Sequence, residues 1–200
     1  MNKIISLSII LCSPLLSFAD TLYFGAGGGY QSLHGKLEVN NPLLSTHARL
    51  SGEGGVIQLL LGYGIDVNEH FWLGLEVNGE PTTAKINLSI LGLQNEARAL
   101  GGGGIGIKPG YKFNDQTKAY LALGYQVTRF NGTLLNQDLG GAWIDAVRYG
   151  VGFQTNINHR LALRAEVLQS RYRSYKGFIR PVTNQALLGL IWQFDIPSYS

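Results

Sequence analysis

Five charged residues stand within apolar or glycine-rich stretches of this sequence, where large apolar residues alternate with smaller ones. They are Glu76, Lys108, Arg148, Arg164 and Glu166. All five fall on the side of the alternation that carries the smaller residues, together with Gln58, Gln126, Gln154 and Gln193. Such a set could line a gated, ion-conducting lumen, or its members could pair and fill the space as a plug. Because unpaired buried charges are costly, we predict a plug in which Arg148 and Arg164 pair with Glu76 or Glu166.

A second constellation is a basic and aromatic segment near the carboxyl end. No acidic residue occurs between Glu166 and Asp195, while residues 171–180 read Arg-Tyr-Arg-Ser-Tyr-Lys-Gly-Phe-Ile-Arg. Arginine and lysine donate hydrogen bonds to phosphate or sulfate oxygens, and aromatic faces pack against sugar rings. We therefore predict an anion-contact site on an exposed loop, formed by Arg171, Tyr172, Arg173, Lys176 and Arg180.

Patterns typical of cofactor or metal binding are weak. Gly101, Gly103 and Gly106 fit G-x-G-x-x-G, but residues 105–107 continue a strand-like alternation where a dinucleotide site needs a helix. The four histidines, spread over a long loop and short turns, lack the spacing of metal ligands. The sequence therefore predicts no cofactor and no metal site.

One loose candidate for acyl transfer lies in the first long loop. It consists of His47 with Ser45 or Ser51 as nucleophile and Glu53 as the group that orients the histidine. A solvated loop histidine is the more economical interpretation. We therefore predict that the protein is not an enzyme.

A period of two in residue size is the main structural signal, and it indicates β-strands. In residues 56–65, for example, the odd positions from Ile57 to Ile65 are all large and apolar, whereas the even positions include Gln58, Gly62 and Gly64. Similar alternation predicts strands at residues 21–31, 55–65, 71–80, 98–113, 118–130, 142–155, 160–170 and 183–194.

The volumes of the two faces decide which one is inside. A closed barrel of about eight strands has room only for small or extended side chains, so the glycine-rich face must point inward. The bulky apolar face then points outward, and a soluble protein does not expose an apolar band of that size. The sequence predicts an antiparallel, up-and-down, transmembrane all-β barrel that is surrounded by lipid.

The amino terminus and the composition agree with an exported membrane barrel. Residues 1–19 read as a signal peptide, with Lys3, an apolar run and a small residue, Ala19, at the expected cleavage point. Residues 20–200 would form one barrel domain. The 27 glycines are too many for an ordinary packed core, and 14% charged residues are too few for a soluble surface. The formal charge of +3 gives no argument for a nucleic-acid partner.

The connections alternate in length, as they do in outer-membrane barrels. Residues 66–70, 114–117 and 156–159 read as short turns on the periplasmic side, whereas residues 32–54, 81–97, 131–141 and 171–182 read as long irregular loops outside the cell. Aromatic residues cluster at strand ends, as expected for girdles at the two membrane interfaces. They are Tyr63, Phe71, Tyr111, Phe113, Phe153, Trp192 and Phe194 beside the short turns, and Tyr30, Tyr125 and Trp143 beside the long loops.

The closing stretch Leu188-Gly189-Leu190-Ile191-Trp192-Gln193-Phe194 resembles the last strand of the small eight-stranded outer-membrane barrels related to outer-membrane protein A, outer-membrane protein X and the opacity proteins. Phe71-Trp72-Leu73-Gly74-Leu75-Glu76 and Leu161-Ala162-Leu163-Arg164-Ala165-Glu166 are similar to strands of that family with an inward Glu or Arg. Here six residues follow Phe194, whereas the family's chain usually ends at that aromatic. Pro109, inside the fourth strand, is expected at a bulge or an unpaired position.

The resemblance implies a role in envelope integrity, adhesion or resistance to host factors, carried by exposed loops. We expect a monomer in the bacterial outer membrane that contacts lipid and lipopolysaccharide. The basic segment would neutralise lipopolysaccharide phosphates at the rim or bind a host or polysaccharide ligand. A small porin-like channel and a lipid-modifying outer-membrane enzyme are the alternatives.

Overall fold

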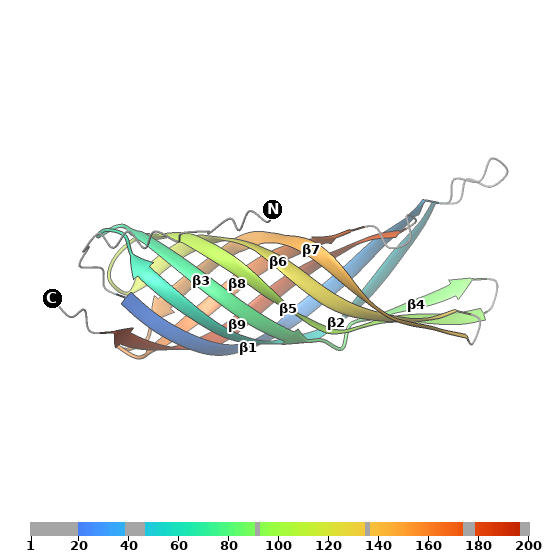
Figure 1. The fold of residues 1–200 in the computed structure, drawn as a ribbon, viewed down its shortest axis with the longest axis horizontal. Helices are drawn as coiled ribbons and strands as arrows, with labels where there is room; N and C mark the ends of the chain where they lie inside the picture. The colour runs from blue at the N-terminus through green and yellow to red at the C-terminus, as the bar shows by residue number, and fades with distance from the viewer. Residues whose placement is uncertain (1–19, 39–46, 91–92, 135–136, 174–178, 197–200) are drawn as a thin grey trace, which may run out of the picture.

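The computed structural model describes residues 20–38, 47–90, 93–134, 137–173 and 179–196. Within these ranges the chain forms antiparallel β-strands and no helix (Figure 1). The strands are β1 (Asp20–Glu38), β2 (His47–Asp66), β3 (Phe71–Pro81), β4 (Lys85–Ile90), β5 (Leu93–Lys112), β6 (Thr117–Leu134), β7 (Gln137–Asn156), β8 (Leu161–Tyr172) and β9 (Ile179–Ile196). β4 continues the path of β3 after residues 82–84, so the wall of the barrel has the predicted eight strands.

The sheet closes because β1 pairs with both β2 and β9. Following paired residues once around the barrel from Ser32 leads back to β1 at Leu22, a displacement of ten residues. With a rise of about 3.3 Å per residue and about 4.8 Å between strands, this stagger tilts the strands by about 40° and gives a backbone radius of about 8 Å. The lumen is therefore narrow enough for side chains to fill it.

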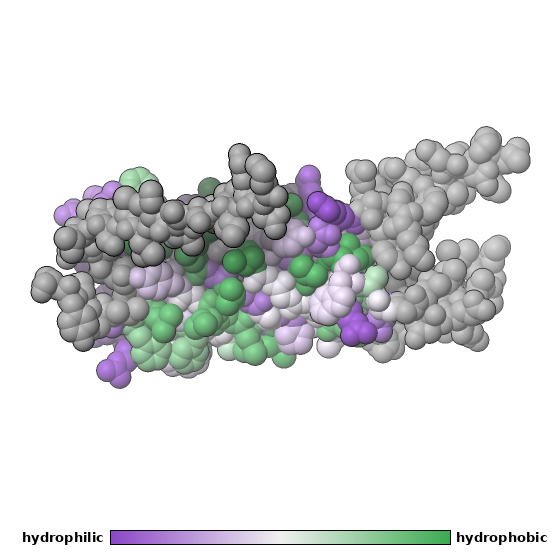
Figure 2. Space-filling view, viewed as in Figure 1, coloured by the Kyte–Doolittle hydropathy of each residue, from purple (hydrophilic) through white to green (hydrophobic). Residues whose placement is uncertain are grey.

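The two faces of the strands are assigned as the volume argument predicts. Leu61 and Leu123 point outward and are 50% and 44% exposed, whereas Gln58 and Tyr120 are buried inside. Figure 2 shows apolar residues across the middle of the described barrel, with hydrophilic residues toward its two ends. The aromatic side chains at the end that carries the short turns also point outward. There Phe24 stacks on Trp192, with 5.5 Å between the ring centroids.

Three short turns at one end of the barrel share one construction. Each begins with an exposed apolar residue followed by asparagine, as in Val67-Asn68, Phe113-Asn114 and Ile157-Asn158. Each asparagine side chain accepts a hydrogen bond of 2.8–2.9 Å from the backbone N–H two residues later. This Asx geometry and backbone hydrogen bonds within each turn reverse the chain. The described chain ends, Asp20 and Ile196, pair with each other at the same end of the barrel.

The prediction of long irregular loops is largely wrong, because the strands continue through most of these segments. β1 and β2 remain paired as far as Glu38 and His47, and β6 and β7 as far as Leu134 and Gln137. β4, inside the predicted loop 81–97, pairs with β5. Hairpins beyond the membrane need only backbone pairing, so they do not require the alternation in residue size on which the prediction depended. In Figure 1 these extensions project from the end opposite the short turns.

Two irregularities interrupt β5. Gly101 has a φ of 140° at a shift in register with β6, and an added Cβ there would lie 2.9 Å from the carbonyl oxygen of Glu80. Glycine therefore satisfies both the backbone angle and the close approach. Pro109 lies where pairing with β6 lapses between Ile107 and Gly110, as its missing N–H requires.

The predicted signal peptide, residues 1–19, lies outside the described residues. Among the residues that are described, no helix is long and apolar enough to span a membrane.

Substituting arginine for Leu61 or Leu123 should lower the free energy of unfolding in lipid by about 2–4 kcal/mol, because both residues face outward midway along their strands. Ile157→Arg is the matched control, since Ile157 is equally exposed but lies in a short turn. Urea unfolding in lipid vesicles measures the effect. The folded fraction can be followed by the different gel migration of unheated and boiled samples. Equally small effects at all three positions would contradict a lipid-facing outer wall.

Candidate functional site

The interior is organised around one arginine held between two tyrosines. Tyr23 and Tyr120 lie directly against the glycines opposite them on the next strand, Gly62 and Gly152, where any side chain would collide with the ring. The guanidinium carbon of Arg164 lies 5.3 Å from the Tyr23 ring centroid and 5.6 Å from that of Tyr120. Cation–π attraction therefore supplements the ion pairs described next.

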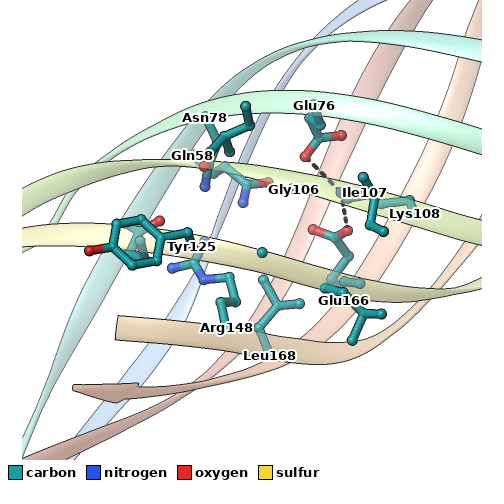
Figure 3. Close-up of a pocket in the computed structure, with 15 residues that line it drawn as sticks. Gln58, Glu76, Asn78, Gly106, Ile107, Lys108, Tyr125, Arg148, Glu166 and Leu168 are labelled. Atoms are coloured by element: carbon teal, nitrogen blue, oxygen red, sulfur yellow. Dashed lines mark hydrogen bonds and ion pairs between the residues drawn. The ribbon is translucent and has the colours of Figure 1, made fainter. Parts of the chain in front are cut away.

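Nearer the short turns, two acids and two bases form a buried cluster that we call the lower ionic layer. Lys108 Nζ lies 2.7 Å from Glu76 Oε1 and 2.6 Å from Glu166 Oε1, so it bridges the two carboxylates (Figure 3). Arg164 Nη1 donates to Glu76 Oε2 at 2.6 Å, and its other nitrogens donate to Gln154. Tyr120 donates to Glu166 at 2.7 Å. Four of the five charges selected from the sequence therefore form one neutral, hydrogen-bonded unit.

The fifth charge, Arg148, lies nearer the long hairpins, in a separate cluster that we call the upper ionic layer. Its Nη1 and Nη2 donate to the two oxygens of Glu80 at 2.5 and 2.6 Å, as a bidentate pair. Gln58, Asn78 and Gln185 also donate to Glu80. The predicted pairing of Arg148 with Glu76 or Glu166 is thus wrong, because those acids lie lower in the lumen and already bind Lys108 and Arg164.

Glu80 is a buried charged residue that the sequence analysis does not predict. A signal is present, since Glu80 shares the inward parity of Glu76 and closes the predicted strand 71–80.

Apolar side chains lie between the two ionic layers. On β8, Leu168 lies between Glu166 of the lower layer and Ser170, which accepts a hydrogen bond from Arg148 Nε at 3.1 Å. Leu168 packs with Val56, Ala122 and Leu187. Charged and apolar side chains together occupy the cross-section of the lumen.

Little space remains inside the barrel. The cavity drawn in Figure 3, which touches both ionic layers, has a volume of about 30 Å³, and another beside Arg164 and Glu166 has about 10 Å³. Spaces of this size hold one or two water molecules at most. Within the described residues no group of His, Cys, Asp and Glu could hold a metal ion. The interior can exclude solutes but has no room for a substrate.

The predicted catalytic candidate does not assemble on these strands. His47 and Glu53 both lie on β2, six residues apart, so their backbones are separated by about 20 Å. Glu53 instead accepts a short hydrogen bond from Tyr30. Ser45 lies outside the described residues. Gly101, Gly103 and Gly106 all lie within β5, as the sequence analysis expects for a chance match.

The structure divides the predicted anion-contact residues. Arg171 and Arg173 are exposed on the outside of β8 and just beyond it. The prediction that Tyr172 belongs to the exposed anion-contact site is wrong. Its side chain points into the barrel and is buried, and its hydroxyl lies 2.9 Å from Thr128 Oγ1. The physical reason is that β8 continues to residue 172, which keeps the inward parity of Arg164. Lys176 lies outside the described residues, as does the side chain of Arg180.

Comparison with known proteins agrees with this architecture. Residues 6–194 match the family of the outer membrane protein β-barrel domain. The chain belongs to this family. As an outer-membrane β-barrel, it lies in the bacterial outer membrane, and its apolar outer wall contacts lipid. Comparison with curated protein sequences gives no match.

Several solved structures are similar to this outer-membrane β-barrel. The attachment invasion locus protein Ail of Yersinia pestis is 14% identical, covers 86% of this chain and 99% of its own, and has a TM-score of 0.50. Neisserial surface protein A, also 14% identical, covers 86% and 97% with a TM-score of 0.49. The outer-membrane protease OmpT of Escherichia coli is 9% identical and covers 90% and 99% with a TM-score of 0.47. These likenesses concern the fold alone.

A double-mutant cycle on Arg148 and Glu80 should show strong coupling. Arg148→Met or Glu80→Gln alone leaves a buried charge unpaired and should lower the free energy of unfolding by about 3–5 kcal/mol. The double variant should lower it by much less than the sum of the two single effects. The control cycle uses Arg173 and Asp145, whose exposed pair at 3.1 Å should couple by at most about 1 kcal/mol. Additive effects at Arg148 and Glu80 would contradict their pairing.

Proposed function

We propose that this barrel is a non-enzymatic surface-interaction protein, exported by a signal peptide in residues 1–19 and monomeric in the outer membrane. Its interior is a structural plug, and its activity resides at the end that carries the long hairpins. There it binds anionic polysaccharides and so serves adhesion, envelope integrity or resistance to host factors. The observation that carries the proposal is the filled lumen, in which cavities of about 30 and 10 Å³ lie beside two neutral ionic layers.

The basic segment supports a polyanionic ligand. The Arg173 side chain is 82% exposed even while it contacts Asp145. Residues 167–194 contain no acid that could neutralise Arg171, Arg173, Lys176 and Arg180 from within the segment. Ail, which shares the fold, has been crystallised with the heparin analogue sucrose octasulfate. Arginine-rich surfaces suit sulfate and phosphate groups because guanidinium donates two parallel hydrogen bonds.

Reconstituted into planar bilayers, the folded wild-type protein should show no large, long-lived conductance, because both ionic layers obstruct the lumen. Single-channel recording at several voltages measures this directly. A matched preparation of boiled protein controls for nonspecific leakage. Stable channels that appear only with the folded sample would support the porin-like alternative.

Changing Arg171, Arg173, Lys176 and Arg180 together to Ser should weaken binding to heparin at least tenfold at low salt, because the segment loses its phosphate- and sulfate-binding donors. Wild-type binding should also fall as ionic strength rises. Binding of the detergent-folded proteins to immobilised heparin measures both effects. Arg160→Ser, in a short turn at the opposite end, should leave binding unchanged. Equal affinity of the quadruple variant and the wild type would refute the proposal.

A further inference from the structure

A row of polar side chains interrupts the apolar outer wall across β7, β8 and β9. Tyr149, Gln169 and Asn184 are direct neighbours in the strand register and all point outward. Tyr149 donates a short hydrogen bond to Gln169, and Gln169 Nε2 donates to Asn184 Oδ1 at 2.7 Å. Polar groups on a surface that faces lipid are costly unless they are satisfied, so their grouping on three adjacent strands indicates a function for this patch.

Apolar residues flank the polar row on both sides along the strands. The next outward row toward the short turns is Val151, Val167 and Ala186, and Val151 and Val167 are more than half exposed. Toward the hairpins, Arg171 pairs in register with Val147 and Val182, and Val147 is 61% exposed. The row is therefore a polar patch within the lipid-facing band, and it borders a single arginine.

Arg171 begins the basic segment and also contacts this patch. Its Nε donates to Gln169 Oε1 at 3.2 Å, and its guanidinium lies 5.5 Å from the centroid of the Tyr149 ring. In contrast to Arg173, which contacts Asp145, Arg171 has no acidic partner within the described part of the chain. Its terminal nitrogens can therefore donate in parallel to an anion that approaches along the wall.

The height of the patch matches the outer lipid interface. A strand rise of about 3.3 Å per residue and a tilt of about 40° give about 2.5 Å of height per residue. Measured from Leu161 beside the short turns, Gln169 lies about 20 Å and Arg171 about 25 Å toward the hairpins, and the apolar band of such barrels is about 25 Å tall. Arg171 therefore lies where lipid headgroups of the outer leaflet begin.

We propose that Tyr149, Gln169, Arg171 and Asn184 form a binding site for a phosphate of lipid A, the membrane anchor of lipopolysaccharide. Arg171 supplies the charge and forked donors, while the Gln169 and Asn184 amides bind sugar or phosphate oxygens beside it. Lipid A fits better than a free polyanion because the patch lies in the wall and is bordered by valines that contact acyl chains. The proposed site requires that the hairpin end of the barrel faces the outside of the cell. It does not require that the basic segment binds heparin.

The test measures lipopolysaccharide bound to the folded, full-length protein. Arg171→Gln and the double variant Gln169→Val/Asn184→Val are incorporated into nanodiscs, and their affinity for fluorescently labelled lipopolysaccharide is compared with that of the wild type. Arg171→Gln should bind about tenfold more weakly, since a charge-assisted contact to phosphate is lost. Arg160→Gln, at the periplasmic end, is the control and should bind as the wild type does.

Competition experiments identify the ligand's chemistry. Unlabelled lipopolysaccharide should displace the probe, whereas enzymatically dephosphorylated lipopolysaccharide and phosphatidylglycerol should not. Unchanged binding by Arg171→Gln would overturn the site, and so would a change in oligomeric state without a change in lipopolysaccharide binding. Equal displacement by phosphatidylglycerol would overturn the assignment to lipid A. The Gln169→Val/Asn184→Val variant should retain heparin binding, so failure of this site is distinguishable from failure of the basic segment.

Discussion

Closure of an eight-strand sheet with a register displacement of ten residues is the constraint on which the rest of this structure depends. It fixes a backbone radius of about 8 Å, so a large inward side chain fits only where small residues lie beside it. Gly62 and Gly152 accept the rings of Tyr23 and Tyr120 for this reason. Most of the large apolar residues then lie on the outer face, and an apolar outer face requires lipid. Membrane location and a filled lumen both follow from this geometry.

Buried charges in so narrow a space must be neutralised locally. The lower layer balances Glu76 and Glu166 against Lys108 and Arg164, and the upper layer balances Glu80 against Arg148. Such pairs add little net stability relative to apolar residues of the same volume, since desolvation offsets most of their attraction. Their consequence is specificity: a strand displaced by one residue would face its charge toward lipid, so the network penalises incorrect registers.

Much of this fold could be predicted because period-two patterning and side-chain volume are local properties of the sequence. The eight wall strands, the inward face and the inward position of Arg164 and Glu166 all follow from parity and size. The partner of Arg148 could not be predicted, because it depends on the stagger between β3 and β7, which are far apart in sequence. The inward position of Tyr172 follows from the parity of β8, but only once the strand is known to extend that far. The polar patch could not be predicted from the sequence, because Gln169 and Asn184 become neighbours only through strand pairing.

The two ionic layers are stacked along one axis with the Leu168 layer between them, so they act as closures in series. A passage through the barrel requires both to be open at the same moment, and the probability of that event is the product of two small probabilities when the layers open independently. A change that dissolves one layer therefore leaves the membrane sealed by the other. Rearrangement within one layer therefore does not by itself open the lumen from end to end.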